Sequence, residues 1–398
     1  MTTVATPTGA AQTMVLNMGP QHPSTHGVLR VILELDGEIV VKAEPIIGYL
    51  HTGIEKSCEK LTYAQAITLT DRIDYLAPLS NNLCYCLAIE KLLNLQVPKR
   101  PQYIRVLLTE LTRIASHLVW IGTHAIDLGA MSVFLYTFRE REEILKILEY
   151  VSGQRMMTTY FRVGGLALEP PPGWLERVRR FIDSFPDHLD EYEDLLTNNR
   201  IWMGRTKGIG VISAADAIAL GASGPMLRGS GVAYDIRKAF PYSSYEEFDF
   251  DIQVQTAGDC YARYQVRMAE MRESLKIVRQ AIDKIPAEGP FRAEAPGVTP
   301  PAREEMKTSI EGLIYHFKIY TEGFAPPAGE VYQAIESPRG ELGVFLVSDG
   351  SAKPYRVKFR TPSFIHLQTL PKLCEGRLIA DVVACIGTTD IVLGEVDR

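Results

Sequence analysis

Nine residues near the start of the chain, 19–27, constrain its local fold more than any other stretch. They read GPQHPSTHG. A short strand pattern precedes them over residues 15–18, and a longer one, rich in β-branched and other apolar residues, follows over residues 28–35. Two prolines limit the backbone and two glycines permit tight bends, so the sequence predicts a restrained loop at a strand turn.

The loop carries two imidazoles, those of His22 and His26. A separation of four residues would suggest a metal pair on a helix, but Pro23 and the flanking glycines argue against a helix. A restrained loop of this kind can hold a proton donor in a cavity. The alternative is a hydrogen-bonded hairpin loop with ordinary polar side chains, and the local residues favour the two interpretations equally.

Composition excludes several classes of protein. The 398 residues are 46% hydrophobic and 23% charged, typical of a globular protein, and the length suggests two or three packed substructures. The formal charge of −6 does not provide the basic surface that proteins use to bind nucleic acids. No apolar run approaches the roughly eighteen residues that a membrane span needs. The first residues lack the regions of a secretory signal. We therefore expect residues 1–13 to be a disordered tail, and the chain to lie in the cytosol or on the cytosolic side of a membrane.

The cysteines give no sign of a metal centre. No two of them form a CxxC pair, so neither a zinc set nor an iron–sulfur set can be derived from their spacing. We expect buried, reduced thiols at all six positions. The six are Cys58, Cys84, Cys86, Cys260, Cys374 and Cys385.

Strand patterns lie near both ends of the chain, and helical patterns fill the middle. Residues 29–45 predict a β-hairpin that turns at Asp36 and Gly37, and residues 331–360 predict short strands separated by turns. Residues 259–285 are expected to form the longest helix, with Arg/Glu pairs at helical spacing. The other long helices are expected over residues 76–95, 103–120 and 132–151.

These patterns predict an α+β fold, with a long-helix core and small antiparallel sheets near the N- and C-terminal parts. We divide the chain into the tail and three further regions. They are the disordered tail 1–13, an N-terminal β-hairpin region 14–48, a helical core 49–290 and a C-terminal α+β region 291–398.

Two further side chains are candidates for a site. Tyr75 has a phenol that can donate a proton, although a single tyrosine is more often a core residue with a satisfied hydroxyl. Asp127 stands between Ile126 and Leu128, where a carboxylate is costly unless it is paired, for example with an imidazole. A helix cap or a surface position explains Asp127 equally well. The glycine-rich stretches match no nucleotide-binding motif, and no nucleophile elbow is present.

Several long motifs point to one family. NMGPQHPSTHGVLR, RIDYL, ELTRIASHLVW, DLGAMSVFLYTFRERE and the ending GEVDR resemble the quinone-site subunit of respiratory complex I, the D subunit of the proton-translocating NADH:quinone oxidoreductase. The resemblance covers residues 14–398. It implies a peripheral-arm subunit that forms the quinone head-group site, accepts electrons from an iron–sulfur cluster in a neighbouring subunit, and has no activity alone.

The same resemblance implies partners and a location. The expected neighbours are the iron–sulfur B subunit, the C subunit, the membrane-embedded H subunit and the other proteins of complex I. The expected place is the cytoplasmic side of the cell (inner) membrane, where the chain is peripheral and touches the membrane through its partners. No nucleic acid is expected, and quinone is the expected substrate.

The family is similar in fold to the large subunit of nickel–iron hydrogenases, which hold their metal with two CxxC pairs. Those four positions map onto Asp74, Ala77, Val392 and Glu395, so the thiolates that a nickel–iron site requires are absent. The resemblance thus implies that the old metal cavity, closed by the C-terminal region, now takes a quinone head group, and that no metal is bound.

The predicted catalytic residues are carried over from the family. His26 and Tyr75 would hydrogen-bond the two quinone carbonyls, and Asp127 would pair with His26. Thr123 resembles a further head-group contact, and Arg72 matches an arginine near the iron–sulfur cluster of the neighbour.

One position departs from the family pattern. Met157 stands where many members have a histidine that tunes the nearby cluster, which leaves the quinone type and any pH-dependent cluster potential open. Two other interpretations remain: a ferredoxin-linked relative of complex I, and a metal-free structural subunit. A hydrogenase-type large subunit is disfavoured by the missing cysteines.

Overall fold

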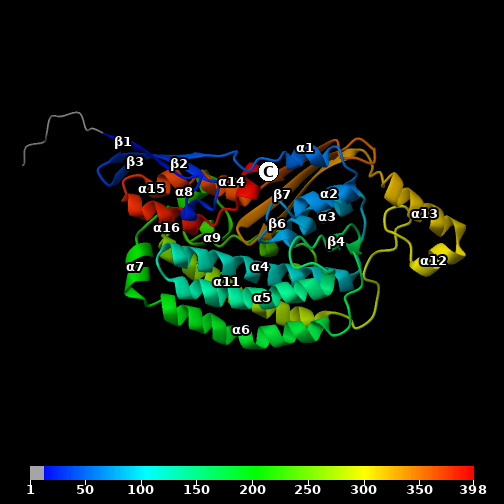
Figure 1. Cartoon of the computed structure of the whole chain (residues 1–398). Coiled ribbons are helices and arrows are strands. Elements are labelled where there is room, and N and C mark those ends of the chain that lie inside the picture. The colour runs from blue at the N-terminus through cyan, green and yellow to red at the C-terminus, as the bar shows by residue number, and fades with distance from the viewer. Residues whose placement is uncertain (1–12) are drawn as a thin grey trace, which may run out of the picture.

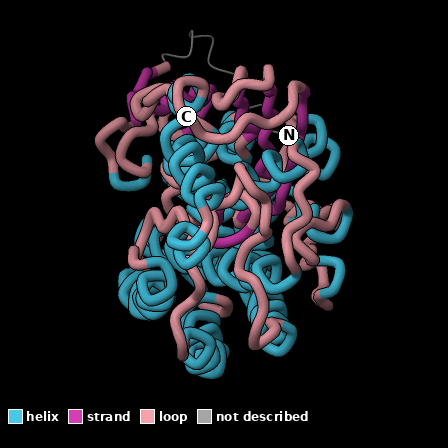
Figure 2. The backbone as a smooth tube through the Cα atoms, turned by 90° about the vertical axis from the view of Figure 1, so that its right-hand side faces the viewer, coloured by secondary structure: helices cyan, strands magenta, loops and turns pink. Residues whose placement is uncertain are grey.

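Residues 13–398 are described by the computed structural model, and they form an α+β fold as predicted. The part of the expected tail before residue 13 lies outside the described residues. Three antiparallel sheets of three, two and three strands are present among residues 13–398. Figure 1 shows the two larger sheets along the upper side and the long helices beneath them, and Figure 2 shows the strands gathered in the same upper half.

The first sheet has the order β1-β2-β3 and contains the strands that the sequence predicts. Its register places Leu16 opposite Leu33, and Leu33 opposite Ala43. Inward and outward residues alternate along β2, so one face packs on the helices and the other meets solvent. The strands are β1 (Met14–Met18), β2 (Arg30–Asp36) and β3 (Ile39–Ile46).

The other two sheets involve later parts of the chain. β6 and β7 pair in register from Gly329 opposite Ser348 to Ser337 opposite Gly340, and the turn between them carries Arg339. These strands confirm the pattern predicted for residues 331–360. The bounds are β4 (Phe161–Arg162), β5 (Gly165–Leu166), β6 (Gly329–Ser337), β7 (Gly340–Ser348) and β8 (Arg356–Arg360).

Four long helices run side by side below the sheets (Figure 1). The prediction that residues 259–285 form the longest helix is wrong, because α4 has 29 residues and α11 has 25. Pro101 falls in the first turn of α4, where a missing N–H costs little, so the helix begins before the predicted residue 103. The four are α4 (Lys99–Asp127), α5 (Met131–Ser152), α6 (Trp174–Leu196) and α11 (Cys260–Lys284).

Helix α6 is absent from the sequence prediction. Pro186 inside it weakens the helical signal, yet the helix continues through that residue. Its apolar face, which includes Val178, Phe185 and Leu189, is buried. Packing of this face overrides the local penalty of the proline.

The charges of α11 also differ from expectation. Arg263, Arg267 and Glu270 are buried and bond to other elements instead of pairing along the helix surface. Asp259, the predicted start, is the N-cap of this helix, and its side chain accepts the Ala262 N–H at 2.7 Å.

The remaining helices are shorter, and the one over Pro78–Leu92 is almost wholly buried in the core. They are α1 (Ile54–Cys58), α2 (Tyr63–Thr70), α3 (Pro78–Leu92), α7 (Arg200–Thr206), α8 (Ala214–Ala219), α9 (Gly224–Arg228), α10 (Ile236–Ala239), α12 (Arg303–Thr308), α13 (Ile310–Thr321), α14 (Pro362–Leu367), α15 (Leu370–Cys374), α16 (Ile379–Thr389) and α17 (Leu393–Asp397). Two 3₁₀ turns complete the set, η1 (Pro23–Thr25) and η2 (Tyr245–Glu247).

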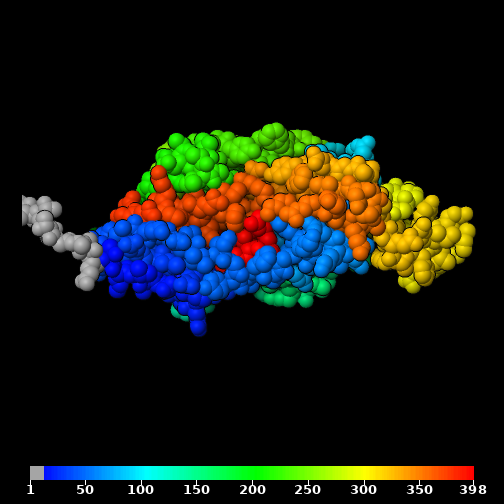
Figure 3. Space-filling model, turned by 90° about the horizontal axis from the view of Figure 1, so that it is seen from above, coloured from blue at the N-terminus to red at the C-terminus, as the bar shows by residue number. Residues whose placement is uncertain are grey.

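The C-terminal helix α17 fills the middle of the upper face. Figure 3 shows it in red between the N-terminal part in blue and the C-terminal sheet in orange. The Asp397 carboxylate accepts the backbone N–H groups of Gly48 and Leu50 at 2.8 and 2.6 Å. These bonds join the end of the chain to the segment after β3.

The six cysteines are all buried and free, as predicted. Within residues 13–398, none of the helices combines the length and the apolar character that crossing a bilayer requires.

Candidate functional site

The loop between β1 and β2 is a single 3₁₀ turn held by its own side chains. His22 caps η1, since its Nδ1 accepts the Ser24 N–H at 3.2 Å. The Thr25 hydroxyl is buried and lies 2.8 Å from the His22 carbonyl oxygen. His26 ends the turn in the left-handed conformation, with φ of 54°. The expectation of a restrained, non-α-helical loop is therefore confirmed.

Asp127 and Thr123 lie in the last turns of α4. The Ser24 hydroxyl donates to the Asp127 carboxylate at 3.2 Å. Among the described residues, Ser24 is the donor to this carboxylate. The predicted pairing of Asp127 with His26 stays a prediction. The Thr123 hydroxyl donates to its own helix, with the Val119 carbonyl at 2.9 Å.

Tyr75 lies in the segment between α2 and α3 and is half-buried. Burial raises the pKa of its phenol, and the negative charge of Asp74 raises it further. The backbone of Leu393, at the start of α17, hydrogen-bonds to the same phenol. Gly394 allows this close packing, because a Cβ there would lie 2.7 Å from the Ile73 carbonyl oxygen.

A buried group of charges lies beside Tyr75, and we call it the cavity cluster: Asp74, Arg339, Asp390 and Glu395. Arg339 bridges it, donating to Asp74 at 2.6 Å and to the backbone oxygen of Asp390 at 2.8 Å. The Asp390 carboxylate lies 3.5 Å from the same guanidinium. Separate segments of the sequence thus meet around the guanidinium of Arg339.

Glu395 completes the cluster as an acid. Burial, followed by the negative charge of Asp74, raises the pKa of Glu395 to about 8, so its carboxyl is largely protonated at neutral pH. One of its oxygens is held by the Ser363 hydroxyl and by the Ser363 N–H at 3.2 Å. Burial also raises the pKa of Asp74, while Arg339, which donates to it directly, acts to lower that pKa.

His26 comes to the same cluster from the N-terminal loop. Desolvation lowers its pKa most, Asp390 raises it and Arg339 lowers it. The side chain is nevertheless exposed. Arg339 therefore contributes to the electrostatics of both His26 and Tyr75.

Several buried polar atoms of this region have no hydrogen-bond partner within residues 13–398. They belong to charged side chains, and two of these, Arg339 and Arg267, have a nitrogen 3.5 and 4.0 Å from the Asp390 carboxylate, within ion-pair range but too far or poorly aligned for a hydrogen bond. A polar ligand or water placed there would satisfy them. They are Asp390 Oδ2, Glu395 Oε1, Arg339 Nη2 and Arg267 Nη1.

Comparison with known proteins gives a consistent family. Residues 127–398 match the family described as the 49 kDa subunit of respiratory-chain NADH dehydrogenase. The chain is 67% identical over 385 residues to the first of the NADH-quinone oxidoreductase D subunits of Solibacter usitatus, covering 97% of this chain and 94% of the relative. It is 65% identical over 390 residues to the second such D subunit of Koribacter versatilis, covering 98% and 97%. It is 60% identical over 389 residues to the D subunit of Geotalea uraniireducens, covering 98% and 100%.

The chain belongs to the 49 kDa subunit family of respiratory NADH dehydrogenases. Within this family member, the four positions mapped onto hydrogenase cysteines lie around the cavity cluster. Ala77 and Val392 offer no metal-binding atom, and Asp74 and Glu395 are engaged by Arg339 and Ser363. No group of three or more potential metal ligands occurs among residues 13–398.

Arg72 and Met157 lie outside the cavity cluster. Arg72 is exposed and donates to the Thr68 carbonyl at 2.7 Å. Met157 has a left-handed backbone, with φ of 52°, in a loop fixed by Thr159, whose hydroxyl donates to Asp71 at 2.7 Å. Thr68 and Thr159 line one hollow of about 590 Å³ that also contains Arg162.

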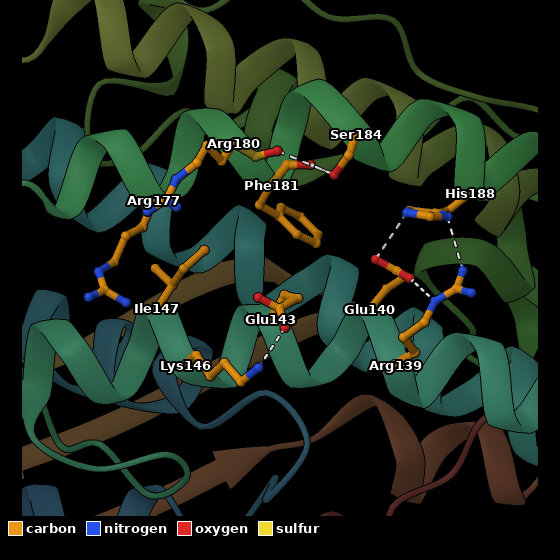
Figure 4. Close-up of a pocket in the computed structure, with 10 residues that line it drawn as sticks. All are labelled: Arg139, Glu140, Glu143, Lys146, Ile147, Arg177, Arg180, Phe181, Ser184 and His188. Carbon is orange, nitrogen blue, oxygen red and sulfur yellow. Dashed lines mark hydrogen bonds and ion pairs between the residues drawn. The ribbon is translucent and has the colours of Figure 1, made fainter.

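A second hollow of about 590 Å³ lies between α5 and α6 (Figure 4). Arg139 pairs with Glu140 and Lys146 with Glu143, and Arg177 and Arg180 also line it, so its basic residues outnumber its acidic ones. It contains none of the five candidate residues.

Sequence reasoning missed the residues at the centre of the site. Arg339 was seen only as part of a turn signal, and Asp390 was not singled out. Arg339 is buried, and burying a charge costs free energy unless the charge is paired. The sequence shows Arg339 only as part of a Ser-Pro-Arg-Gly turn and does not reveal that it is buried.

Proposed function

We propose that this chain is the quinone-binding subunit of a proton-translocating NADH:quinone oxidoreductase, and that His26 and Tyr75 bind the quinone head group. The relatives are named as D subunits of NADH-quinone oxidoreductase. The observation that supports the proposal is a buried cluster next to Tyr75 whose polar atoms lack hydrogen bonds within the described residues and whose Arg339 contributes to the electrostatics of both His26 and Tyr75.

The protonation states suit this chemistry. Reduction of a quinone to a quinol takes two electrons and two protons, and the protons need nearby donors. Tyr75 keeps its proton at neutral pH because its pKa is raised, so the phenol can donate as negative charge develops on the quinone oxygen. His26 is neutral at pH 7 because its pKa is lowered, so its ring N–H polarises a carbonyl.

Asp127 and Thr123 have supporting roles in the proposal. A carboxylate near His26 stabilises the imidazolium state through which the ring passes when it relays a proton. Thr123 is half-buried, and its hydroxyl oxygen keeps accepting capacity while its proton is used within α4.

Electrons reach the quinone from a neighbour, since this chain supplies no redox centre in the proposal. We place the iron–sulfur B subunit at the side of Arg72 and the loop of Met157. The hollow beside them, lined by Ile67, Leu166 and Phe324, supports this placement because its walls are apolar as well as charged. The proposed fold is that of the nickel–iron hydrogenase large subunit, with residues 291–398 closing the cavity.

Exposed apolar side chains support further partners, which we propose to be the C subunit and the membrane-embedded H subunit. Helix α13 projects from the body (Figures 1 and 3), and Ile310, Phe317 and Tyr320 on it are each more than 60% exposed. Ile47 and Tyr49, after β3, are exposed as well. Such surface is costly in water unless a partner covers it. Through the H subunit the chain would lie at the cytoplasmic side of the inner membrane.

The test uses membranes from cells whose complex carries His26→Ala or Tyr75→Phe. Quinone reduction is compared with reduction of an artificial acceptor that takes electrons upstream of the site. We expect quinone reduction to fall by at least about a hundredfold while the artificial activity persists. Matched controls are His188→Ala and Tyr355→Phe, both distant from the cluster.

A metal-free structural subunit is the second candidate. It predicts that both activities survive in His26→Ala and Tyr75→Phe. Comparing NADH with reduced ferredoxin as donor in the same membranes separates complex I from its ferredoxin-linked relative.

A further inference from the structure

Helix α6 carries opposite charges on two of its faces. On one face, Asp190 and Glu193 pair with Arg272 of α11, at 2.6 and 2.9 Å. On another face, Arg177 and Arg180 lie one helical turn apart and line the hollow of about 590 Å³ between α5 and α6. The acidic face of α6 is thus partnered within this chain, whereas the two arginines face an open space.

Arg177 and Arg180 keep their charges available. Both side chains are exposed, and within residues 13–398 neither forms an ion pair or a side-chain hydrogen bond. The Arg177 guanidinium lies 4.0 Å from the centre of the Tyr150 ring of α5. This cation–π contact holds the guanidinium in place without neutralising its charge. Its planar N–H groups can therefore still bind a carboxylate through two hydrogen bonds.

The other basic residues of the hollow are paired within the chain. Arg139 forms an ion pair with Glu140, and the Lys146 amine lies 2.7 Å from the Glu143 carboxylate. Figure 4 shows the first of these pairs at the opposite end of the hollow from Arg177. The positive charge of the hollow is therefore concentrated at the end that holds the two arginines of α6.

Two further observations indicate what this end of the hollow would bind. Ile147 and Phe181 also line it, so apolar surface lies beside the two cations, as in sites that bind a peptide. Glu143 lines the same hollow and would repel a compact phosphate group, whereas carboxylates spaced along a peptide can avoid it. The whole chain has a formal charge of −6, so this surface attracts an acidic segment that the rest of the chain repels.

We propose that Arg177 and Arg180, with Ile147 and Phe181 beside them, form a docking site for an acidic segment of a neighbouring protein in the assembled complex. Each guanidinium takes one carboxylate of that segment. The family matched by this chain is a subunit of a respiratory-chain NADH dehydrogenase, so neighbouring proteins are present. The site goes beyond the proposed function, because none of the proposed quinone-site residues lines this hollow.

The first experiment uses Arg177→Lys and Arg180→Lys in the assembled complex. A lysine keeps the positive charge and supplies an amine, which a water-soluble carbodiimide joins to a carboxylate in direct contact with it. Mass spectrometry then identifies the linked peptides. We expect an amide between the introduced amine and an aspartate or glutamate of another protein. The matched control is Arg179→Lys, on an exposed residue of the same helix that does not line the hollow, and it should give no such link.

The second experiment removes both charges with the double variant Arg177→Gln/Arg180→Gln. The protein identified by the cross-link should leave the complex at a lower salt concentration, with its apparent Kd raised about tenfold, as for two exposed ion pairs. Arg179→Gln should dissociate as the wild type does. The quinone-site variants His26→Ala and Tyr75→Phe should leave the cross-link intact, so this proposal and the proposed function can fail separately.

The proposal is overturned if Arg177→Lys and Arg180→Lys give no amide to another protein, or no more than Arg179→Lys gives. It is also overturned if the double glutamine variant dissociates at the same salt concentration as the wild type. Phosphorus analysis covers the other occupants of the same charge. Phosphate or phospholipid that is bound to the wild type and lost from the double variant, without a cross-link, would assign the hollow to a phosphate group and would equally reject the docking of a protein segment.

Discussion

Two regions of this protein bury many charges, and they differ in how those charges are partnered. The first, which we call the core network, joins α4, α9, α10, α11 and β6. Each of its four carboxylates accepts hydrogen bonds through both oxygens. Its members are Glu110, Arg113, His117, Arg228, Asp235, Arg237, Glu270 and Glu336.

The second region, the cavity cluster, is as deeply buried but incompletely partnered. Asp390 and Glu395 each keep one carboxylate oxygen without a hydrogen bond within the described residues, and Arg339 keeps one nitrogen. In the core network the atoms without a hydrogen bond belong to Arg113 and His117, and every carboxylate oxygen is bonded, whereas in the cavity cluster carboxylate oxygens are left available to a ligand. The difference separates a structural set of charges from a functional one where residue types alone do not.

The largest effect is expected from Glu110→Gln in the core network. Arg113 and Arg237 would lose a buried counter-charge, at a cost of about 3–5 kcal/mol of stability. We expect little assembled complex and a lower Tm, measured by native electrophoresis and thermal unfolding. Normal assembly with an unchanged Tm would remove the structural role assigned to this network.

Arg339→Lys should separate activity from stability in the cavity cluster. A lysine keeps the charge but cannot bridge Asp74 and the Asp390 carbonyl with a planar fork. The charged groups around His26 and Tyr75 would then no longer be held in place. We expect quinone reduction to fall on the order of a hundredfold while artificial-acceptor activity and assembly are retained. Equal losses of all three would make Arg339 a structural residue like Arg113.

Glu395→Gln tests the protonated carboxyl through the pH dependence of stability. The pKa of Glu395 is raised from 4.5 to about 8, so the folded state holds a proton that the unfolded state releases between these values. This contribution to stability is complete below pH 4.5 and is lost as the pH rises to about 8. The wild-type Tm should therefore fall with pH relative to that of the variant, and parallel curves would contradict the assignment.

The smallest effect is expected from Glu142→Gln, in an ion pair on the surface. Glu142 accepts from both terminal nitrogens of Arg155, at 2.8 and 2.6 Å, but the two side chains are 38% and 47% exposed. Solvent screening should limit the loss of stability to no more than about 1 kcal/mol, measured by thermal unfolding. A loss as large as that of Glu110→Gln would show that pairing geometry matters more than burial.

Local patterns in the sequence were enough for the N-terminal hairpin and the restrained loop. Alternating apolar residues and Asp36-Gly37 define β2 and β3, and two prolines with two glycines exclude an α-helix around His26. The extents of α4 and α6 were not predictable in the same way. Pro101 and Pro186 weaken the local signal, and packing of the buried faces decides the outcome.

The candidate site was only partly predictable. His26, Tyr75 and Asp127 carry recognisable motifs, but the Ser24 partner of Asp127 depends on where an N-terminal loop meets the end of a helix 103 residues away. Arg339 stood in a turn signal, and its contact with Asp74 joins residues 265 positions apart. No local pattern reports a contact of that kind.

The sequence by itself determined the fold class, the family and the chemical types available at the site. These follow from residue periodicity and from motifs, which are local properties of the chain. The tertiary structure alone decided which charges are satisfied and which are left open, because burial and hydrogen-bond geometry arise only when distant segments pack. That packing distinguishes Glu110, which stabilises the core, from Glu395, which holds a proton beside the proposed quinone site.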